Sequence, residues 1–273
     1  VSNYQIEVAF QYNITLKQAP GLGIAIISLK NFSIILHLLT VKTKLLNCLI
    51  EIQIWDIMNK DWDIIVVGGG IAGLATTALL SKYNLKTLCI EPQKPPLEEN
   101  AFSADLRSTA YLVDSIEILK KTGAWDLLEC QAEELRVMRI CDTGSLKKQR
   151  YQEVNFKSKE INLPNFGYNI PNWFVKKSLH SIIKSSDTGH VSFKQKVVGI
   201  NSRLDKCIIR LSDDRSLSAK LIVASDGRES DIRFLSKIKT KKWDNNQDAI
   251  AFIVTHEKAH EGTSIEVLQS GGP

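Results

Sequence analysis

The sequence predicts an α/β fold in which a buried parallel strand leads into a helix and then into a second strand. Three observations support this. Residues 63–67 are almost entirely apolar, as expected for a parallel strand buried on both faces. Apolar residues then recur at helical spacing from Leu74 to Leu79. Residues 87–90 form a second short strand-like run, which ends at Glu91.

Glycines stand between the first strand and the helix at the spacing G-x-G-x-x-G. They are Gly68, Gly70 and Gly73, with Gly69 inside the motif. In such a turn the first glycine permits a sharp bend, the second lets the backbone approach a pyrophosphate, and the third lets helix and strand pack closely. The amino terminus of the helix offers free N–H groups and a positive dipole end to phosphates.

Glu91 completes this pattern, because it lies 23 residues after Gly68, where a carboxylate can bind both ribose hydroxyls. It would repel a 2′-phosphate, so the spacing favours FAD or NAD over NADP. Glycines at this spacing are weak evidence alone, but strand, glycines, helix, strand and acid occur here in order. The segment therefore predicts dinucleotide binding, and the alternative is a strand–turn–helix without a ligand.

Further elements are predicted along the rest of the chain. A helical pattern opens at residues 105–110 and stops near Gly123, and residues 136–160 mix strand-like pieces with polar turns. Asn172 is a candidate cap for a helix over residues 173–185. The remaining expectations are strands at 191–200, 207–211, 221–224 and 249–254, and a turn at Asp213-Asp214.

Several motifs together resemble a known family. The sequences GGGIAG at 68–73, DLRSTA at 105–110 and ASDGRESDIR at 224–233 resemble those of the class A FAD-dependent aromatic hydroxylases. The stretches FGYNIPNW at 166–173 and WDNNQDAIAFIVTHEKAHEG at 243–262 are similar to the ubiquinone-biosynthesis hydroxylases within that family. The resemblance covers about residues 60–273.

The resemblance implies roles for particular residues. The glycines would hold the FAD diphosphate, Glu91 the adenosine ribose, and Arg107 the pyrophosphate. Asp226-Gly227 matches a DG motif that helps to bind FAD and is implicated in NAD(P)H use; read alone, the same pair is a turn after a strand. No acid or base stands out as catalytic. The expected cofactor-binding residues are Gly68, Gly69, Gly70, Gly73, Glu91, Arg107, Asp226 and Gly227.

The implied activity is hydroxylation of a phenolic ubiquinone precursor by FAD, with NAD(P)H and O₂ as co-substrates. The implied fold is a Rossmann-type FAD-binding domain, residues 58–135 and 166–235, interleaved with a β-rich substrate domain, residues 136–165 and 236–273, as in p-hydroxybenzoate hydroxylase. The family's later G-D motif is not found after Ser230, so the fold is expected to be incomplete at its carboxyl end. The alternative is an inactive remnant that binds at most the ADP part of FAD.

Residues 1–57 differ in composition from the rest, because 32 of the 57 are apolar. Residues 21–41 have the length of a bilayer span, but Lys30 stands near the middle of that stretch, where a charge is costly. Residues 50–54 alternate as in a short strand. We expect an extension outside the enzyme core, with Met58 as the natural start; the alternative is a membrane anchor.

Composition and charge exclude several classes of protein. Hydrophobic residues make up 44% and charged residues 24%, values near the globular average, which rules out a disordered or fibrous chain. The net charge of +5 comes from scattered residues, which argues against nucleic-acid binding. The five cysteines show no C-x-x-C spacing and are expected to be free thiols in a reducing, cytoplasmic setting. A polyprenyl-phenol substrate would imply peripheral contact with the inner face of a membrane.

One motif points to a different chemistry. His256 to His260 matches the zinc-peptidase pattern H-E-x-x-H, which needs both histidines on one helical face and a third ligand downstream. The residues before it are strand-like and a third ligand is not evident. The sequence therefore predicts no metal site.

Overall fold

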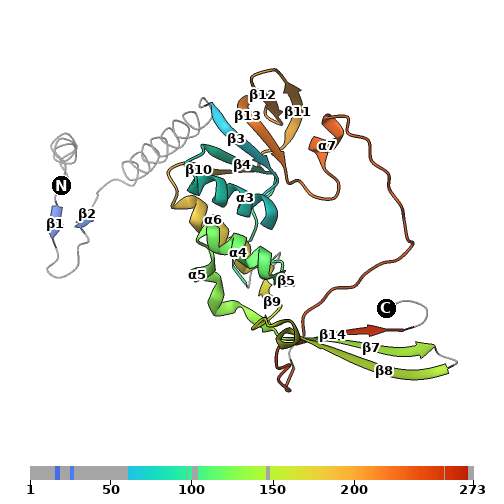
Figure 1. Cartoon of the computed structure of the whole chain (residues 1–273). Helices are drawn as coiled ribbons and strands as arrows, with labels where there is room; N and C mark the ends of the chain where they lie inside the picture. Colours follow the sequence, from blue (N-terminus) through green and yellow to red (C-terminus); the bar gives the residue numbers. More distant parts are fainter. Residues whose placement is uncertain are drawn as a thin grey trace. The chain divides into compact units, whose positions relative to one another are not determined.

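A computed structural model describes residues 61–96, 98–99, 104–145, 148–254 and 256–269, and the backbone of 16–18 and 25–27 (Figure 1). The chain divides into two units, Val1–Lys60 and Asp61–Pro273. In the first unit, strands β1 (Leu16–Gln18) and β2 (Ala25–Ile27) pair antiparallel. The expectations of a strand at residues 50–54, a start at Met58 and an anchor around Lys30 lie outside the described residues.

The centre of the second unit is a six-stranded sheet in the order β10-β4-β3-β13-β12-β11. Neighbours among the first four strands run parallel, and β12 and β11 continue the sheet antiparallel. The α/β fold predicted from the buried apolar runs is confirmed. The strand bounds are Trp62–Val67 (β3), Thr87–Glu91 (β4), Gly189–Phe193 (β10), Val197–Ser202 (β11), Cys207–Leu211 (β12) and Ser216–Ala224 (β13).

The single strand predicted over residues 191–200 is wrong. Lys194 adopts a left-handed backbone, φ 62°, and ends β10. The chain then passes from one edge of the sheet to the other. β10 is the edge strand that pairs with β4, and β11 is the opposite edge strand, which pairs with β12. The turn at Asp213-Asp214 is confirmed, and Asp214 is left-handed there, φ 65°.

Helices α3 (Ile71–Lys82), α4 (Val113–Thr122) and α6 (Asn172–Lys184) share one apolar core with the short helix α5 (Trp125–Leu128). Each helix turns a mainly apolar stripe toward this core, and a few small polar residues, such as Thr77, Thr122 and Ser178, are buried with it. The fully buried members of this core include Leu74, Ala78, Cys89, Leu128, Ile170, Val175 and Leu179.

The helix predicted to open at residues 105–110 begins later. Its end at Gly123 is confirmed, since Gly123 is left-handed with φ 82° and closes α4. Residues 105–107, however, form a loop, and Ser108–Leu112 form strand β5, because their backbone groups pair with β9 (Gly167–Pro171). This pairing between segments distant in the sequence overrides the helical spacing of the apolar residues.

Two further sheets lie outside the central one. β5, β9 and β6 (Glu133–Leu135) form an antiparallel sheet. In the other sheet, β7 (Val137–Ser145) pairs antiparallel with β8 (Lys148–Lys157) and parallel with β14 (Thr263–Leu268). Figure 1 shows β14 beside β7, although more than a hundred residues separate them in the chain. Short 3₁₀ turns follow α5 at Glu129–Gln131 and β8 at Ser158–Ile161.

The strand predicted at residues 249–254 is wrong. Helix α7 (Asp231–Leu235) is followed by a long segment, and its described residues up to Gly262 form no helix or strand. Ile250 and Phe252 are 87% and 76% exposed. A strand needs a partner for its N–H and C=O groups, and none of the described strands pairs with this segment.

No helix in the described part of the chain is long and apolar enough to cross a membrane.

Candidate functional site

The glycine turn lies at the carboxyl edge of the parallel strands. Gly68 follows the last residue of β3, and its N–H donates to the carbonyl of Ile90 in β4 at 2.8 Å. On the other side, the Ser225 N–H donates to the carbonyl of Val67 at 2.7 Å. The end of β4 and the start of the 225–227 turn therefore flank the glycine turn, and segments predicted separately from the sequence meet at one edge.

Gly68 and Gly73 are required by the fold itself. Gly68 is left-handed, φ 104°, and a Cβ there would overlap the backbone of Ser225. A Cβ on Gly73 would overlap the carbonyl oxygen of Gly68. The tight turn and the close packing of helix on strand therefore explain these two glycines without a ligand.

Glu91 is tied to the turn by a hydrogen bond. The Gly69 N–H donates to Oε2 of Glu91 at 2.5 Å, and the Gln93 N–H donates to Oε1 at 3.0 Å. A Cβ on Gly69 would come within 2.8 Å of the Glu91 Cβ. The carboxylate is thus fixed beside the glycine turn, at the end of β4.

Gly70 is different, because neither packing nor backbone conformation requires a glycine there. It precedes α3 with φ −66° and ψ 176°, which any residue can adopt, and a Cβ would meet no heavy atom within 4 Å. No side chain caps α3, and its first turn carries no acid. The N–H groups expected to be free at a helix start therefore have no capping side chain here.

Asp226 is engaged within the chain. One carboxylate oxygen accepts a hydrogen bond from the Ser230 hydroxyl at 2.6 Å, and the other accepts from the Ile232 N–H at 2.9 Å. Ser230 in turn accepts from the Arg233 N–H at 3.0 Å and caps α7. Gly227 is left-handed, φ 83°, with open space around it. The Asp226 side chain thus orders the turn and the start of α7.

Arg107 lies in the loop before β5, where its guanidinium binds the Asp105 carboxylate. Nε donates to Oδ1 at 2.8 Å and Nη2 to Oδ2 at 3.0 Å. These hydrogen bonds, with one from Asn172, lower the pKa of Asp105 to about 2. Within the described part of the chain, no hydrogen bond joins Arg107 to the glycine turn.

Asn172 does not cap its helix as predicted. It is the first residue of α6 and makes no capping hydrogen bond with its side chain. Its amide instead donates to Asp105 at 3.0 Å and accepts from the Thr109 hydroxyl at 2.6 Å. No sequence pattern indicates this role, because it depends on residues that are more than 60 positions away in the chain.

The arrangement of the helices places the Arg107 loop at the same edge as the glycine turn. α6 leads into β10, which runs parallel to β4. The Thr188 hydroxyl, just after α6, donates to the carbonyl of Ser81 near the end of α3 at 2.8 Å. The carboxyl ends of α3 and α6 therefore meet. Their amino termini lie at the carboxyl edge of the strands, and the Arg107 loop is bound to the amino terminus of α6.

The H-E-x-x-H residues form no helix, as expected. The two histidines, His256 and His260, line an open cavity of about 510 Å³ with Glu133, Glu134 and Arg136. His256 Nδ1 lies 2.6 Å from the carbonyl of Lys258, whereas His260 Nδ1 accepts from the Gly262 N–H. A neutral His260 therefore carries its proton on Nε2 and offers no lone pair there. Over the ranges that the structure describes, no group of three or more ligating side chains could hold a metal.

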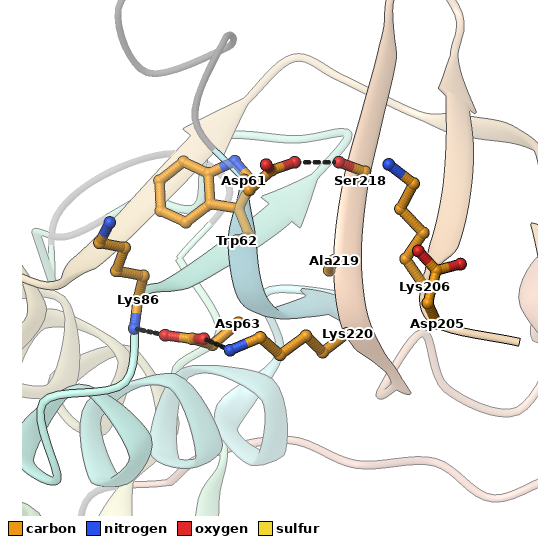
Figure 2. A pocket seen from close by; sticks show the side chains of 9 residues that line it. All are labelled: Asp61, Trp62, Asp63, Lys86, Asp205, Lys206, Ser218, Ala219 and Lys220. Atoms are coloured by element: carbon orange, nitrogen blue, oxygen red, sulfur yellow. Dashed lines mark hydrogen bonds and ion pairs between the residues drawn. The ribbon is translucent and has the colours of Figure 1, made fainter.

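A second open pocket, of about 380 Å³, lies at the opposite end of β3 (Figure 2). Both aspartates of its β3 side are hydrogen-bonded to residues of β13. Lys220 binds Asp63 at 2.7 Å, and the Ser218 hydroxyl donates to Asp61 at 2.6 Å. Since Asp61 and Trp62 stand at the amino end of β3, this pocket is not part of the edge that carries the glycine turn.

Residues 61–264 match the family model described as FAD binding domain. The chain belongs to this family. The curated relatives include the ubiquinone hydroxylase UbiL of Rhodospirillum rubrum, 25% identical over 217 residues, covering 79% of this chain and 48% of the relative. The 3-demethoxyubiquinol 3-hydroxylase of Escherichia coli is 23% identical over 215 residues, covering 79% and 54%. The chain thus spans about half the length of these relatives.

Solved structures show the same fold. PqsL, a probable FAD-dependent monooxygenase from Pseudomonas aeruginosa, has a TM-score of 0.54 at 19% identity, covering 68% of this chain and 48% of PqsL. The flavin-dependent monooxygenase PieE, in complex with FAD and substrate, has a TM-score of 0.53 at 17% identity, covering 66% and 33%. The resemblance to the FAD-dependent hydroxylases drawn from the motifs is confirmed, and with it FAD as the family's cofactor.

Proposed function

We propose that this chain binds FAD at the carboxyl edge of its parallel strands and serves as the flavin-binding part of an aromatic-ring monooxygenase. The observation that carries the proposal is Gly70. Neither packing nor backbone conformation requires a glycine at position 70, and this residue stands before an uncapped helix start with open space where a side chain would lie. A diphosphate lying against the backbone would account for this glycine and for the free N–H groups of α3.

The other residues fit the ADP part of FAD. Glu91 is fixed beside the glycine turn, where its carboxylate can bind the ribose hydroxyls. Arg107 lies at the same edge and can add a charge-assisted contact to the diphosphate. Gly227 leaves open space at the turn after β13, where the protein backbone could make further contacts with the cofactor. Asp226 supports this turn through its hydrogen bonds to the start of α7.

The reaction proposed is hydroxylation of a phenolic ubiquinone precursor, with NAD(P)H as reductant and O₂ as oxidant. Two of the curated relatives are named a ubiquinone hydroxylase and a 3-demethoxyubiquinol 3-hydroxylase. Bound flavin would supply the redox and oxygen chemistry, while the protein binds and orients it and excludes water. In this proposal the FAD-binding domain comprises residues 58–135 and 166–235, and residues 136–165 and 236–273 contribute to the substrate domain. A polyprenyl tail on the substrate would bring the protein to a membrane surface from the cytoplasmic side.

A second candidate is binding of the ADP part of FAD without catalysis. It is favoured by the placement of the fitting residues, since Gly70, Glu91 and Arg107 all suit the ribose and diphosphate. No residue within the described ranges has a contact or position that assigns it to the isoalloxazine ring.

Binding and turnover measurements separate these candidates. The purified chain is titrated with FAD, FMN and ADP, and bound flavin is followed by the change in its fluorescence. NAD(P)H oxidation and hydroxylated product are then measured with a phenolic quinone precursor. Binding of FAD and ADP but not FMN is expected, because FMN lacks the adenosine. Product formation would favour the monooxygenase, ADP binding without product the second candidate, and no binding of FAD or ADP would contradict both.

A further inference from the structure

We propose that Asp105 and Asn172 are positioning residues that hold Arg107 ready to bind a diphosphate. This rests on the proposed function, because it assigns Arg107 a cofactor phosphate as its ligand. Neither Asp105 nor Asn172 touches the diphosphate in this proposal. They act through the orientation of the guanidinium.

The Asp105–Arg107 pair leaves the outer edge of the guanidinium open. Arginine has five N–H donors in a planar fork. Asp105 accepts one from Nε at 2.8 Å and one from Nη2 at 3.0 Å. Nη1 and the second N–H of Nη2 make no hydrogen bond among the described residues. That outer edge has the geometry that binds two oxygens of a phosphate.

Asp105 is itself held by a buried amide. Asn172 is only 8% exposed; its Nδ2 donates to Asp105 at 3.0 Å, and its Oδ1 accepts from Thr109 at 2.6 Å. These bonds fix which way the amide is oriented, and so fix the carboxylate. Arg107 is 62% exposed along its side chain, so without Asp105 it would sample many rotamers.

The backbone fixes the same loop independently of these side chains. The Asn172 N–H donates to the carbonyl of Arg107 at 2.8 Å, and the Trp173 N–H donates to the carbonyl of Asp105 at 3.1 Å. β5 and β9 continue this pairing from Ser108 onward. The loop therefore stays attached to α6 when the carboxylate is changed, which makes a side-chain variant informative.

The test compares two ligands that differ only in the diphosphate. Asp105→Asn keeps the shape and one acceptor oxygen but loses the charge that orients Arg107. Affinities for ADP and for adenosine are measured by NMR titration of the full chain. We expect Asp105→Asn to weaken ADP binding about 10-fold, the loss of part of a charged hydrogen-bond pair, and to leave adenosine binding unchanged. Asp126→Asn, an exposed acid in α5, is the matched control and should change neither.

A double-mutant cycle with Arg107→Gln tests whether Asp105 acts through Arg107. If it does, Asp105→Asn has no further effect on ADP binding once Arg107 is Gln. Asn172→Ala should resemble Asp105→Asn in its selectivity for ADP, even if its melting temperature is lower.

Each other outcome counts against the proposal. Equal weakening of ADP and adenosine would mean that Asp105 only supports the structure. Tighter ADP binding in Asp105→Asn would mean that Asp105 competes with the diphosphate for Arg107. If the unmodified chain binds neither ADP nor FAD, the proposed function fails and this proposal fails with it. If it binds adenosine and ADP equally, Arg107 makes no diphosphate contact and this proposal fails. If the unmodified chain prefers ADP to adenosine but the variants do not change ADP binding as expected, this proposal fails and the proposed function stands.

Discussion

The backbone N–H of Gly69 lies 2.5 Å from Oε2 of Glu91, and this hydrogen bond joins the turn after β3 to the end of β4. It uses one carboxylate oxygen to hold the turn and leaves lone pairs on both oxygens. The residue expected to recognise the ribose is therefore also part of the structure of the glycine turn. Variants at this position must separate these two roles.

Glu91→Gln should separate them. The amide keeps an acceptor oxygen for the Gly69 N–H but loses the charge and the acceptor for the exposed Gln93 N–H, so the melting temperature should fall less than in Glu91→Ala. Affinity for FAD should fall by about 10-fold, because hydrogen bonds from the ribose to a charged acceptor contribute about 1.5–3 kcal/mol. Fluorescence titration with FAD measures the affinity. Glu91→Ala should lower both affinity and melting temperature, and an unchanged affinity in Glu91→Gln would contradict the ribose assignment.

Gly70→Ala and Gly73→Ala form a matched pair. The added methyl at position 70 meets open space, whereas at position 73 it overlaps the Gly68 carbonyl. Gly70→Ala should therefore keep the free energy of unfolding within about 0.5 kcal/mol and weaken FAD binding by at least about 10-fold. Gly73→Ala should destabilise the fold by about 3 kcal/mol or more. Urea unfolding and FAD titration of both variants provide the comparison. Normal FAD affinity in Gly70→Ala would remove the main support for the site.

The Asp105 carboxylate should make stability depend on pH in acid. Hydrogen bonds from Arg107 and Asn172 lower its pKa from 3.8 to about 2. A lowered carboxyl pKa stabilises the fold above the unfolded-state value, and that stabilisation is lost as pH falls from about 4 to about 2. At pH 7 Asp105→Asn should lose about 1 kcal/mol, a modest value because Arg107 is exposed to solvent.

The measurement is urea unfolding of the unmodified chain and Asp105→Asn across that pH range. The difference between them should be largest near neutrality and should shrink toward pH 2. High salt should also reduce it, since the pair is accessible to ions. A difference that is the same at every pH would point to packing rather than charge.

The cysteines should differ sharply in reactivity. Cys89 is fully buried, and burial raises the pKa of its thiol to about 12, whereas Cys130 is exposed. Because the thiolate is the reactive form, iodoacetamide at pH 8 should modify Cys130 and leave Cys89 unmodified until the chain unfolds. Peptide mass spectrometry with and without denaturant identifies the modified sites. Comparable rates at Cys89 and Cys130 in the folded chain would mean that β4 is not buried as described.

Much of the fold was predictable from local sequence. The apolar runs that become β3 and β4 were predictable because a strand buried on both faces must be apolar throughout. The turn at Asp214 and the end of α4 at Gly123 were predictable because left-handed backbone selects particular residues. Residues 108–112 and 249–254 were not, because strand formation there depends on a partner far away in the chain. The first segment has such a partner in β9, and for the second the described residues supply none.

The sequence by itself determined the dinucleotide motif, its glycines and the acid at the end of the second strand, since these follow one another within a single local unit. Only the tertiary structure distinguished Gly70 from Gly68 and Gly73, because that needs the atoms that would surround each Cβ. It alone also joined Asp105, Thr109 and Asn172 around Arg107. Their hydrogen bonds form between a loop and a helix start that meet only when β5 pairs with β9, and no spacing in the sequence encodes that meeting.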